Sequence, residues 1–485
     1  MKFLLGAILA LSAVEGPASA ALFAAAGKAD VTPDPAAEAV WLAGYGSKGR
    51  RAAGIHDRLH ARAVLVSDGK ATVALVAVDA IGLYREDILD MRRQLGWEGA
   101  DKYLFVSATH DHSAPDTLGL WGRFPGMWGV NAKQHKRLKA TVVGLVKELS
   151  GRLREAELAA AKAEPDPAGL CRDSRDPVVI DPELDVLELK AKGGGSIATV
   201  VRYSCHSEVL AKDNNLVTAD FPGALCAKLE AERGGTCAFL PGSVGGLMTP
   251  DSDDSGPLDA DFKEMERVGH ALAAHAAKAL AVPRLKLKEA KLTVTSRLVK
   301  VPVENSRYLF FLRSLRFGHR LFDNDGRELS AWQAFYRPWR HFFLFPLPER
   351  LRPWVETEVS LVKIGPVKIL GIPGELFPEL AVGGYDGSRR YGRPLVRPTN
   401  PNPPKLATAP KGPYLRERMK ADVGIIVGLA NDELGYLLPE YDFQATPTRT
   451  MLPKPPGTHY EETNSIGPRA TKIILDASDD LLNEP

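Results

Sequence analysis

The stretch ARAVLVSDGKATVALVAVD, residues 61–79, decides the fold because it holds two apolar runs around one turn. Residues 61–67 and 71–79 are rich in Val, Ala and Leu, and Asp68-Gly69 between them is a typical turn pair. The pattern predicts a β-hairpin. Because few polar residues interrupt the runs, it also predicts a sheet that is buried on both faces.

Outward from this hairpin, apolar strands alternate with amphipathic helical patterns. This alternation is typical of an α/β fold, with a large mixed β-sheet flanked by helices and an active site at strand ends. We predict strands over residues 27–33, 103–106, 197–204, 237–240, 367–372 and 423–427, and helices over residues 85–95, 132–158, 224–232 and 261–280.

The composition is typical of a soluble globular protein, with 45% apolar and 25% charged residues among 485. A formal net charge of +2 gives no indication of a nucleic-acid partner. Residues 1–20 have a basic start, an apolar centre and the cleavage pattern Pro17-Ala-Ser-Ala20, which predicts a signal peptide and a secreted or periplasmic protein. We therefore expect residues 21–485 to form the mature domain.

The four cysteines leave two alternatives open. A Cys226–Cys237 disulfide is compatible with an exported chain. Alternatively, all four thiols are reduced and buried as small apolar groups, with Cys171 and Cys205 as the remaining members.

Two segments interrupt the α/β alternation. Residues 304–355 form an aromatic- and arginine-rich helical insertion, which is either a packed subdomain with solvated arginines or a cation-rimmed apolar surface for an amphiphile. The second interpretation would allow peripheral membrane contact. Residues 383–413 are rich in Gly, Pro, Arg and Asn and predict a long irregular loop, either a functional lid or a disordered surface excursion.

Polar residues follow apolar strands at four distant positions: His110-Asp-His112, His206, Glu375 and residues 428–436. On extended backbone, residues two apart point the same way, so His110 and His112 can face one site together. Two histidines and a carboxylate suit Zn²⁺ with an open coordination position. Such a zinc lowers the pKa of a bound water and polarises a carbonyl, which favours hydrolysis.

A series of short motifs runs through the chain in a fixed order. They include Ala29-Asp-Val-Thr-Pro33, Thr109-His-Asp-His-Ser-Ala-Pro115, the His206 segment, Pro373-Gly-Glu375 and Asn431-x-x-x-Gly-Tyr436. Together they resemble the neutral (non-lysosomal) ceramidase family, whose members are zinc amidases that cleave the N-acyl bond of ceramide. The immunoglobulin-like C-terminal domain of many family members has no evident counterpart in this sequence.

The resemblance implies a zinc site made by His110, His206, Glu375 and Tyr436. Among the tyrosines, Tyr441 and Tyr460 are rivals of Tyr436 for the fourth position.

The resemblance also implies two assisting groups. His112 would lie beside the metal as a general acid/base or as a hydrogen-bond donor to the developing oxyanion. Thr249 would offer a hydroxyl from the loop Gly245–Pro250, which departs from the family's Gly-Asp-Val-Ser-Pro run.

Further residues in matching stretches are expected to support the ligands or the substrate. They are Asp79, Arg58, Arg62 and Asp220.

These observations predict a secreted zinc amidohydrolase that cleaves ceramide or a related N-acyl lipid with a metal-activated water. One alternative is a zinc hydrolase of a different amide or an ester. The other is a catalytically silent lipid-binding homologue. The expected partner in each case is a small-molecule or lipid ligand.

Overall fold

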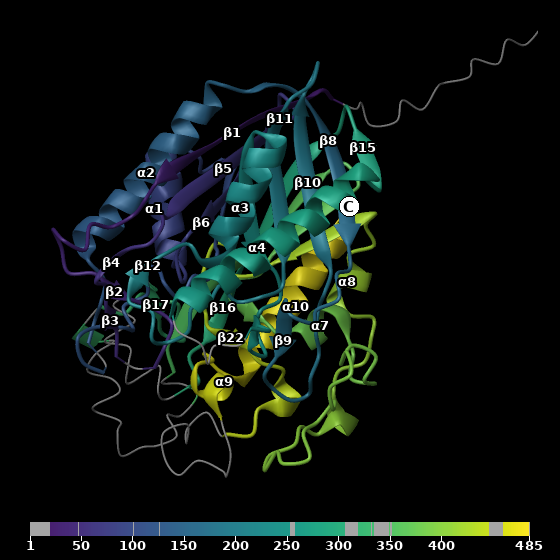
Figure 1. The fold of residues 1–485 in the computed structure, drawn as a ribbon. Coiled ribbons are helices and arrows are strands. Elements are labelled where there is room, and N and C mark those ends of the chain that lie inside the picture. The colour runs from purple at the N-terminus through teal and green to yellow at the C-terminus, as the bar shows by residue number, and fades with distance from the viewer. Residues whose placement is uncertain are drawn as a thin grey trace, which may run out of the picture.

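The computed structural model describes residues 20–484 except 47, 100, 126, 253–257, 306–318, 331, 334–348, 350, 351 and 446–458 (Figure 1). The signal peptide predicted over residues 1–20 lies outside the described residues but for its last position, as does most of the insertion predicted over residues 304–355.

The larger sheet is mixed and has the strand order β13-β11-β10-β8-β1-β5-β6-β7, with β15 paired to β8. Its strands are β1 (Leu22–Asp30), β5 (His60–Ser67), β6 (Thr72–Val78), β7 (Lys102–Ala108), β8 (Arg154–Ala163), β10 (Leu184–Ala191), β11 (Ser196–Tyr203), β13 (Thr236–Pro241) and β15 (Leu285–Leu287). The pairs β6–β7 and β11–β13 are parallel, so the two strands of each pair point in the same direction.

The helices that cover one face of this sheet are α1 (Arg85–Leu95), α2 (Ala132–Ser150), α3 (Asp220–Arg233) and α4 (Leu258–Ala281). Apolar side chains fill the space between these helices and the strands. In β6, Val76 belongs to this helix-side core, whereas its neighbour Leu75 belongs to the core on the opposite face. The alternation explains why the hairpin is apolar at almost every position.

A smaller sheet packs on the opposite face, with the order β16-β18-β19-β21 and β17 paired to β18. Its strands are β16 (Leu292–Pro302), β17 (Leu321–Phe322), β18 (Trp354–Ile364), β19 (Val367–Gly371) and β21 (Val423–Val427). Its outer face is covered by α7 (Pro378–Val382), α8 (Leu415–Arg418) and α10 (Pro468–Asn483). The described residues therefore form four layers, helix–sheet–sheet–helix, and the prediction of a mixed α/β fold is confirmed.

Short strand pairs connect the loops at one end of the two sheets. They are β2 (Trp41–Leu42) with β3 (Arg50–Arg51), β4 (Gly54–Ile55) with β12 (Leu216–Val217), β9 (Cys171–Asp173) with β14 (Met248–Pro250), and β20 (Glu375–Leu376) with β22 (Tyr436–Leu437). The short helices η4 (Leu406–Thr408), η5 (Glu440–Asp442) and α9 (Tyr460–Thr463) complete the described elements.

The predicted hairpin is confirmed as β5 and β6, and the predicted helix over residues 85–95 is confirmed as α1. The helix predicted over residues 132–158 is wrong in its second part. It ends at Ser150, where Gly151 follows, and residues 154–163 are strand β8. Ala and Glu favour a helix there, but β8 pairs with both β1 and β10, and these tertiary contacts override the local preference.

The long segment 383–413 is irregular, as predicted, and it packs on the rest of the chain. Leu395 O accepts a hydrogen bond from Val178 N at 2.8 Å, and Arg397 and Asn400 bind the buried Asp176 carboxylate at 3.1 and 2.6 Å. The alternative of a disordered excursion is therefore wrong.

All four cysteines are free and buried in the structure, which agrees with the second of the two alternatives. They are Cys171, Cys205, Cys226 and Cys237. Burial raises the pKa of the Cys205 and Cys237 thiols. None of the helices within the described residues combines the length and the hydropathy that a bilayer-spanning segment needs.

Candidate metal centre and active site

The residues predicted to bind metal converge where strands of both sheets end. His110 follows β7 and His206 follows β11, both from the larger sheet, and Glu375 follows β19 of the smaller sheet. The two histidine loops are connected, because Asp111 and Ser207 form a parallel bridge and Ser207 Oγ donates to a backbone carbonyl of the neighbouring loop at 2.7 Å.

The imidazoles of His110 and His206 are held in matching orientations. In each ring, Nδ1 lies 2.8 Å from a backbone carbonyl, that of Ile81 for His110 and that of Met248 for His206. The opposite nitrogens, both Nε2, face one carboxylate oxygen, Glu375 Oε2, at 3.5 and 3.2 Å. A carbonyl that binds Nδ1–H fixes the tautomer in which Nε2 carries a lone pair, as metal-binding histidines require.

The site contains buried polar atoms that no hydrogen bond satisfies. His206 Nε2 and Glu375 Oε2 lie close together, but neither has a partner with hydrogen-bond geometry, and both ring nitrogens of His112 also lack one. Ligand atoms of His110, His112 and His206 all lie within 4.8 Å of one another. Unsatisfied buried polar groups are costly, so this donor set fits a cation.

The charges of the site point to the same conclusion. Burial alone would raise the pKa of Glu375, but the His110 and His206 rings lower it to about 2. Burial alone would lower the pKa of His206, but Glu375 and then Glu208 raise it to about 9. Glu375 thus favours a positive charge at His206 Nε2, and a divalent cation between the same atoms would take the place of that proton.

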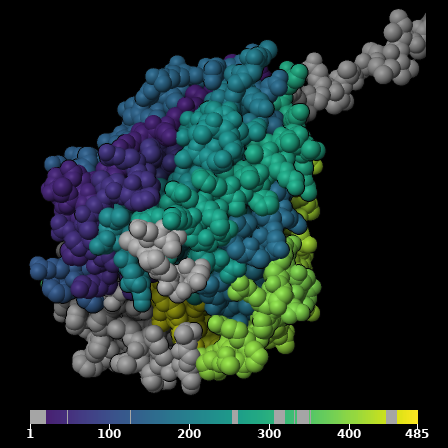
Figure 2. Space-filling view, viewed as in Figure 1, coloured from purple at the N-terminus to yellow at the C-terminus, as the bar shows by residue number. Residues whose placement is uncertain are grey.

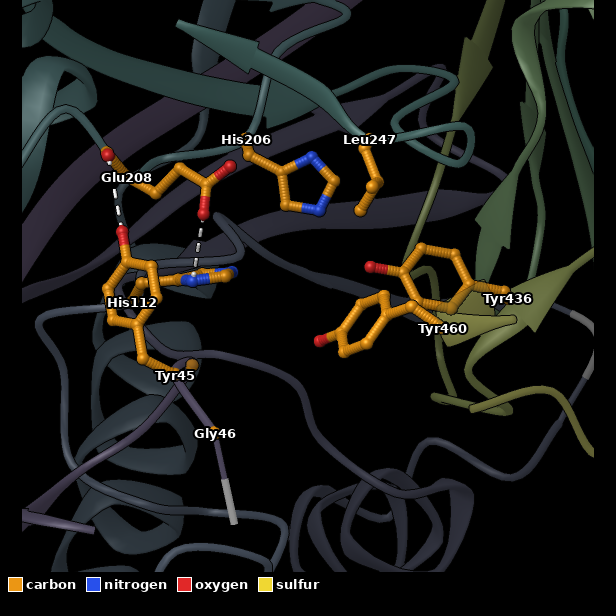
Figure 3. A pocket seen from close by; sticks show the side chains of 9 residues that line it. Tyr45, Gly46, His112, His206, Glu208, Leu247, Tyr436 and Tyr460 are labelled. Carbon is orange, nitrogen blue, oxygen red and sulfur yellow. Dashed lines mark hydrogen bonds and ion pairs between the residues drawn. The ribbon is translucent and has the colours of Figure 1, made fainter. Parts of the chain in front are cut away.

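A cavity of about 260 Å³ opens beside these residues (Figure 3). On one side lie Tyr45, His112 and Glu208, and the hydroxyl groups of Tyr436 and Tyr460 point toward them from the other side (Figure 3). The complete lining is Gly44, Tyr45, Gly46, His112, His206, Glu208, Leu247, Tyr436 and Tyr460.

His112 is oriented by an acidic neighbour. Its Nδ1 lies 3.2 Å from Glu208 Oε2, and Tyr45 Oη donates to the backbone carbonyl of Glu208 at 3.3 Å. Burial, together with the nearby His110 and His206 rings, holds the pKa of His112 well below its usual range.

The three candidate tyrosines have different positions. Tyr436 pairs with Glu375 in the register of β20 and β22, and the Tyr436 and Tyr460 rings are 5.9 Å apart. Tyr441 does not line the cavity. Its ring packs instead against Tyr385, with centroids 5.7 Å apart.

Thr249 also does not line the cavity. It lies in β14, where it pairs with Arg172 of β9. Its neighbour Met248 is the residue whose carbonyl binds His206, so the Gly245–Pro250 loop contributes this carbonyl to the site, and Leu247 of the same loop lines the cavity.

The residues expected to support the site lie at three different places. Arg62 and Asp79 form a buried ion pair of 2.6 Å at the end of the hairpin, and Asp79 also accepts from the backbone of His60. Arg58 is exposed and faces Asp30 at 3.5 Å.

Asp220 supports the segment that carries His206 and Glu208. It is fully buried and accepts from the backbone N–H groups of Val209 and Leu210 at 3.3 and 3.2 Å.

Tyr45 and Glu208 were missed as site residues by the sequence reasoning. A signal for Glu208 was present, because it follows His206 by two residues, just as His112 follows His110. The argument that places two histidines on one side of an extended segment applies equally to this pair. Tyr45 reaches the cavity from the loop after β2, and the pair Gly44-Tyr45 is one of the short motifs that carry the family resemblance.

The chain is similar to several known proteins in sequence and in fold. Residues 23–258 match the family described as neutral/alkaline non-lysosomal ceramidase, N-terminal. The chain is similar to the neutral ceramidase of Pseudomonas aeruginosa, with 26% identity over 274 residues, which cover 50% of this chain and 39% of that protein. It is also similar to the neutral ceramidase of Drosophila melanogaster, with 37% identity over 120 residues, which cover 24% and 16%. The matched segments thus span less than half of these relatives.

Two solved structures have a similar fold. The neutral ceramidase from Pseudomonas aeruginosa superimposes with a TM-score of 0.65 and 17% identity, covering 96% of this chain and 75% of that chain. A ceramidase complexed with C2 superimposes with a TM-score of 0.64 and 16% identity, covering 95% and 75%. At this identity the likeness shows the fold alone.

Proposed function

Because the chain belongs, through residues 23–258, to the neutral/alkaline non-lysosomal ceramidase family, we propose that it is a zinc-dependent hydrolase of an N-acyl lipid amide. The observation that carries this proposal is the convergence of His110 Nε2, His206 Nε2 and Glu375 Oε2 beside a cavity. The apolar, basic pattern of residues 1–20 supports export of the chain.

In this proposal, His110, His206 and Glu375 hold the metal, and Tyr436 lies beside Glu375 as the candidate fourth ligand. Bound zinc supplies Lewis acidity toward a carbonyl oxygen and lowers the pKa of water toward about 7. The carbonyl oxygens of Ile81 and Met248 keep the two imidazoles in the ligating tautomer.

His112 would act on protons in the cavity. Glu208 faces its Nδ1, which leaves Nε2 as the atom to take a proton from the attacking water and return it to the leaving amine. The hydroxyl of Tyr460, which also lines the cavity, would donate to a polar group of the substrate (Figure 3).

Metal analysis of the purified protein tests the proposal. We expect wild type to hold close to one zinc per chain, and His206→Ala and Glu375→Gln to lose most of it together with hydrolysis of an N-acyl lipid. His270→Ala is the matched control, because this histidine lies exposed on α4. The proposal fails if wild type binds no zinc, or if His206→Ala retains it.

A panel of amide and ester substrates, assayed in parallel, tests the class of bond. We expect turnover of N-acyl amides. If the protein hydrolyses esters but no amides, the proposed amidase activity is wrong and the protein is an esterase.

A further inference from the structure

The segment that follows His112 carries large apolar side chains on the surface. The exposed fractions are 39% for Leu120, 55% for Phe124, 49% for Met127 and 47% for Trp128. Single exposed apolar residues are ordinary in soluble proteins, but four within nine positions form a patch, and such patches mark interaction sites. We call these four residues the aromatic patch.

The backbone beneath the aromatic patch is built around one buried carboxylate. Asp116 is 1% exposed, and its two oxygens accept hydrogen bonds from backbone N–H groups along the loop. The donors are Leu118 at 3.0 Å, Gly119 at 2.6 Å, Leu120 at 3.3 Å, Trp121 at 3.0 Å and Gly129 at 3.1 Å. The loop therefore has a defined conformation that holds its apolar side chains outward.

Further backbone bonds close the tip of the loop. Gly122 N donates to Met127 O at 2.9 Å, and Met127 N donates to Phe124 O at 2.9 Å. A preorganised loop loses little conformational entropy when it binds a partner.

The loop that carries the aromatic patch borders the candidate active site. Trp121 Nε1 donates to the carbonyl of Gly46, a residue that lines the cavity, at 3.1 Å. Gly49 N donates to Gly122 O at 2.8 Å, which connects the loop after β2 to the patch. In Figure 2 these purple and blue segments lie side by side at one edge of the molecule.

The two segments at the aromatic patch carry cations. Residues 40–55 and 117–131 contain no Asp or Glu. They contribute the exposed cations Lys48, Arg51 and Arg123, and the Arg123 guanidinium lies 5.5 Å from the centre of the Phe124 ring. Apolar and aromatic side chains rimmed by cations match the acyl and anionic headgroup regions of a lipid bilayer.

We propose that the aromatic patch docks the protein on an anionic bilayer and presents the cavity to it. The choice of a lipid surface rests on the proposed function, since an N-acyl lipid is poorly soluble and must reach the cavity from an aggregate. Binding to the bilayer itself requires no hydrolysis and is measured separately.

Sedimentation of the full-length protein with vesicles tests the docking. We use phosphatidylcholine vesicles with and without phosphatidylserine and expect wild type to bind the anionic vesicles more strongly. Phe124→Ser/Met127→Ser should lower the partition coefficient at least tenfold. The matched control is Val282→Ser/Leu298→Ser, because these residues are 83% and 51% exposed elsewhere on the surface, and it should bind like wild type.

Lys48→Gln and Arg123→Gln test the cations. Each should lower binding to anionic vesicles by about fivefold, the factor that corresponds to about 1 kcal/mol per cation near a charged membrane. Neither should alter binding to neutral vesicles.

The outcomes separate this inference from the proposed function. Vesicle binding that depends on Phe124 and Met127 supports docking even if no amide is hydrolysed. Equal binding by wild type and Phe124→Ser/Met127→Ser overturns it. The docking proposal is also overturned if wild type does not bind vesicles and Phe124→Ser/Met127→Ser abolishes a dimer in solution. The patch would then bind a second copy of the chain.

Discussion

Replacing Gly44 by alanine displaces His112 without changing any titratable group. Gly44 lines the cavity with a backbone φ of +100°. A Cβ added there would lie 2.5 Å from His112 Nδ1 and would also overlap the ring carbon Cγ. Because favourable contacts between heavy atoms begin near 3.5 Å, the imidazole must move by about 1 Å.

The expected magnitude follows from that displacement. A misplacement of about 1 Å in a reacting group lowers the rate by about 100-fold. We therefore expect Gly44→Ala to lower kcat/KM for an N-acyl lipid by about two orders of magnitude. The unfavourable backbone conformation should lower the free energy of unfolding by about 1–2 kcal/mol. Zinc content should stay at the wild-type value, since no proposed ligand is touched.

Steady-state kinetics, zinc analysis and denaturant unfolding of three variants provide the assay. Gly46→Ala and Gly193→Ala are the controls. Gly46 lines the same cavity with a φ of +62°, and the φ of Gly193, +96°, is close to that of Gly44. An added Cβ meets nothing within 4 Å at either position. Both controls should lose stability and keep activity within a few-fold of wild type. Wild-type kcat/KM in Gly44→Ala, or an equal loss in Gly46→Ala, would refute the reasoning.

Glu208→Gln removes the charge that faces His112 Nδ1 at 3.2 Å, so we expect kcat to fall about 10–100-fold with zinc retained; loss of zinc from the variant would contradict this role. The buried Asp181 tests the pH dependence of stability. Burial raises the pKa of its carboxyl, but Arg202 and Arg416 outweigh burial and hold that pKa well below its usual range. The stabilisation is complete above the unfolded-state pKa of about 3.9 and is lost as pH falls toward the folded-state value. Asp181→Asn should cost on the order of 3–5 kcal/mol at neutral pH and flatten the acid limb of a denaturation series; an unchanged limb would argue against the assignment.

The periodicity of the sequence was sufficient to predict the hairpin and the first helix. The hairpin and helix α1 follow from local patterns because their apolar residues lie at the spacing of a strand or a helix. The candidate ligands could also be named in advance, because His110, His206 and Glu375 each follow an apolar strand and lie in motifs that resemble those of the ceramidase family.

Local patterns failed where pairing partners decide the structure. Residues 154–163 have the composition of a helix but form β8 between β1 and β10. The family resemblance implied a hydroxyl from Thr249; the structure places Thr249 in β14, where it pairs with Arg172, and the carbonyl of its neighbour Met248 binds His206. Neither outcome is visible within a short window of sequence.

The sequence by itself determined which residue types follow which strands, because strand and helix periods are local properties of the chain. Only the tertiary structure decided that His110 and His206, from the larger sheet, share an oxygen of Glu375 from the smaller one. That meeting depends on two sheets packing face to face, which is set by the apolar surface buried between them over residues far apart in the chain. The same packing decided that Glu208 lies against His112 and that Tyr436 and Tyr460, but not Tyr441, line the cavity.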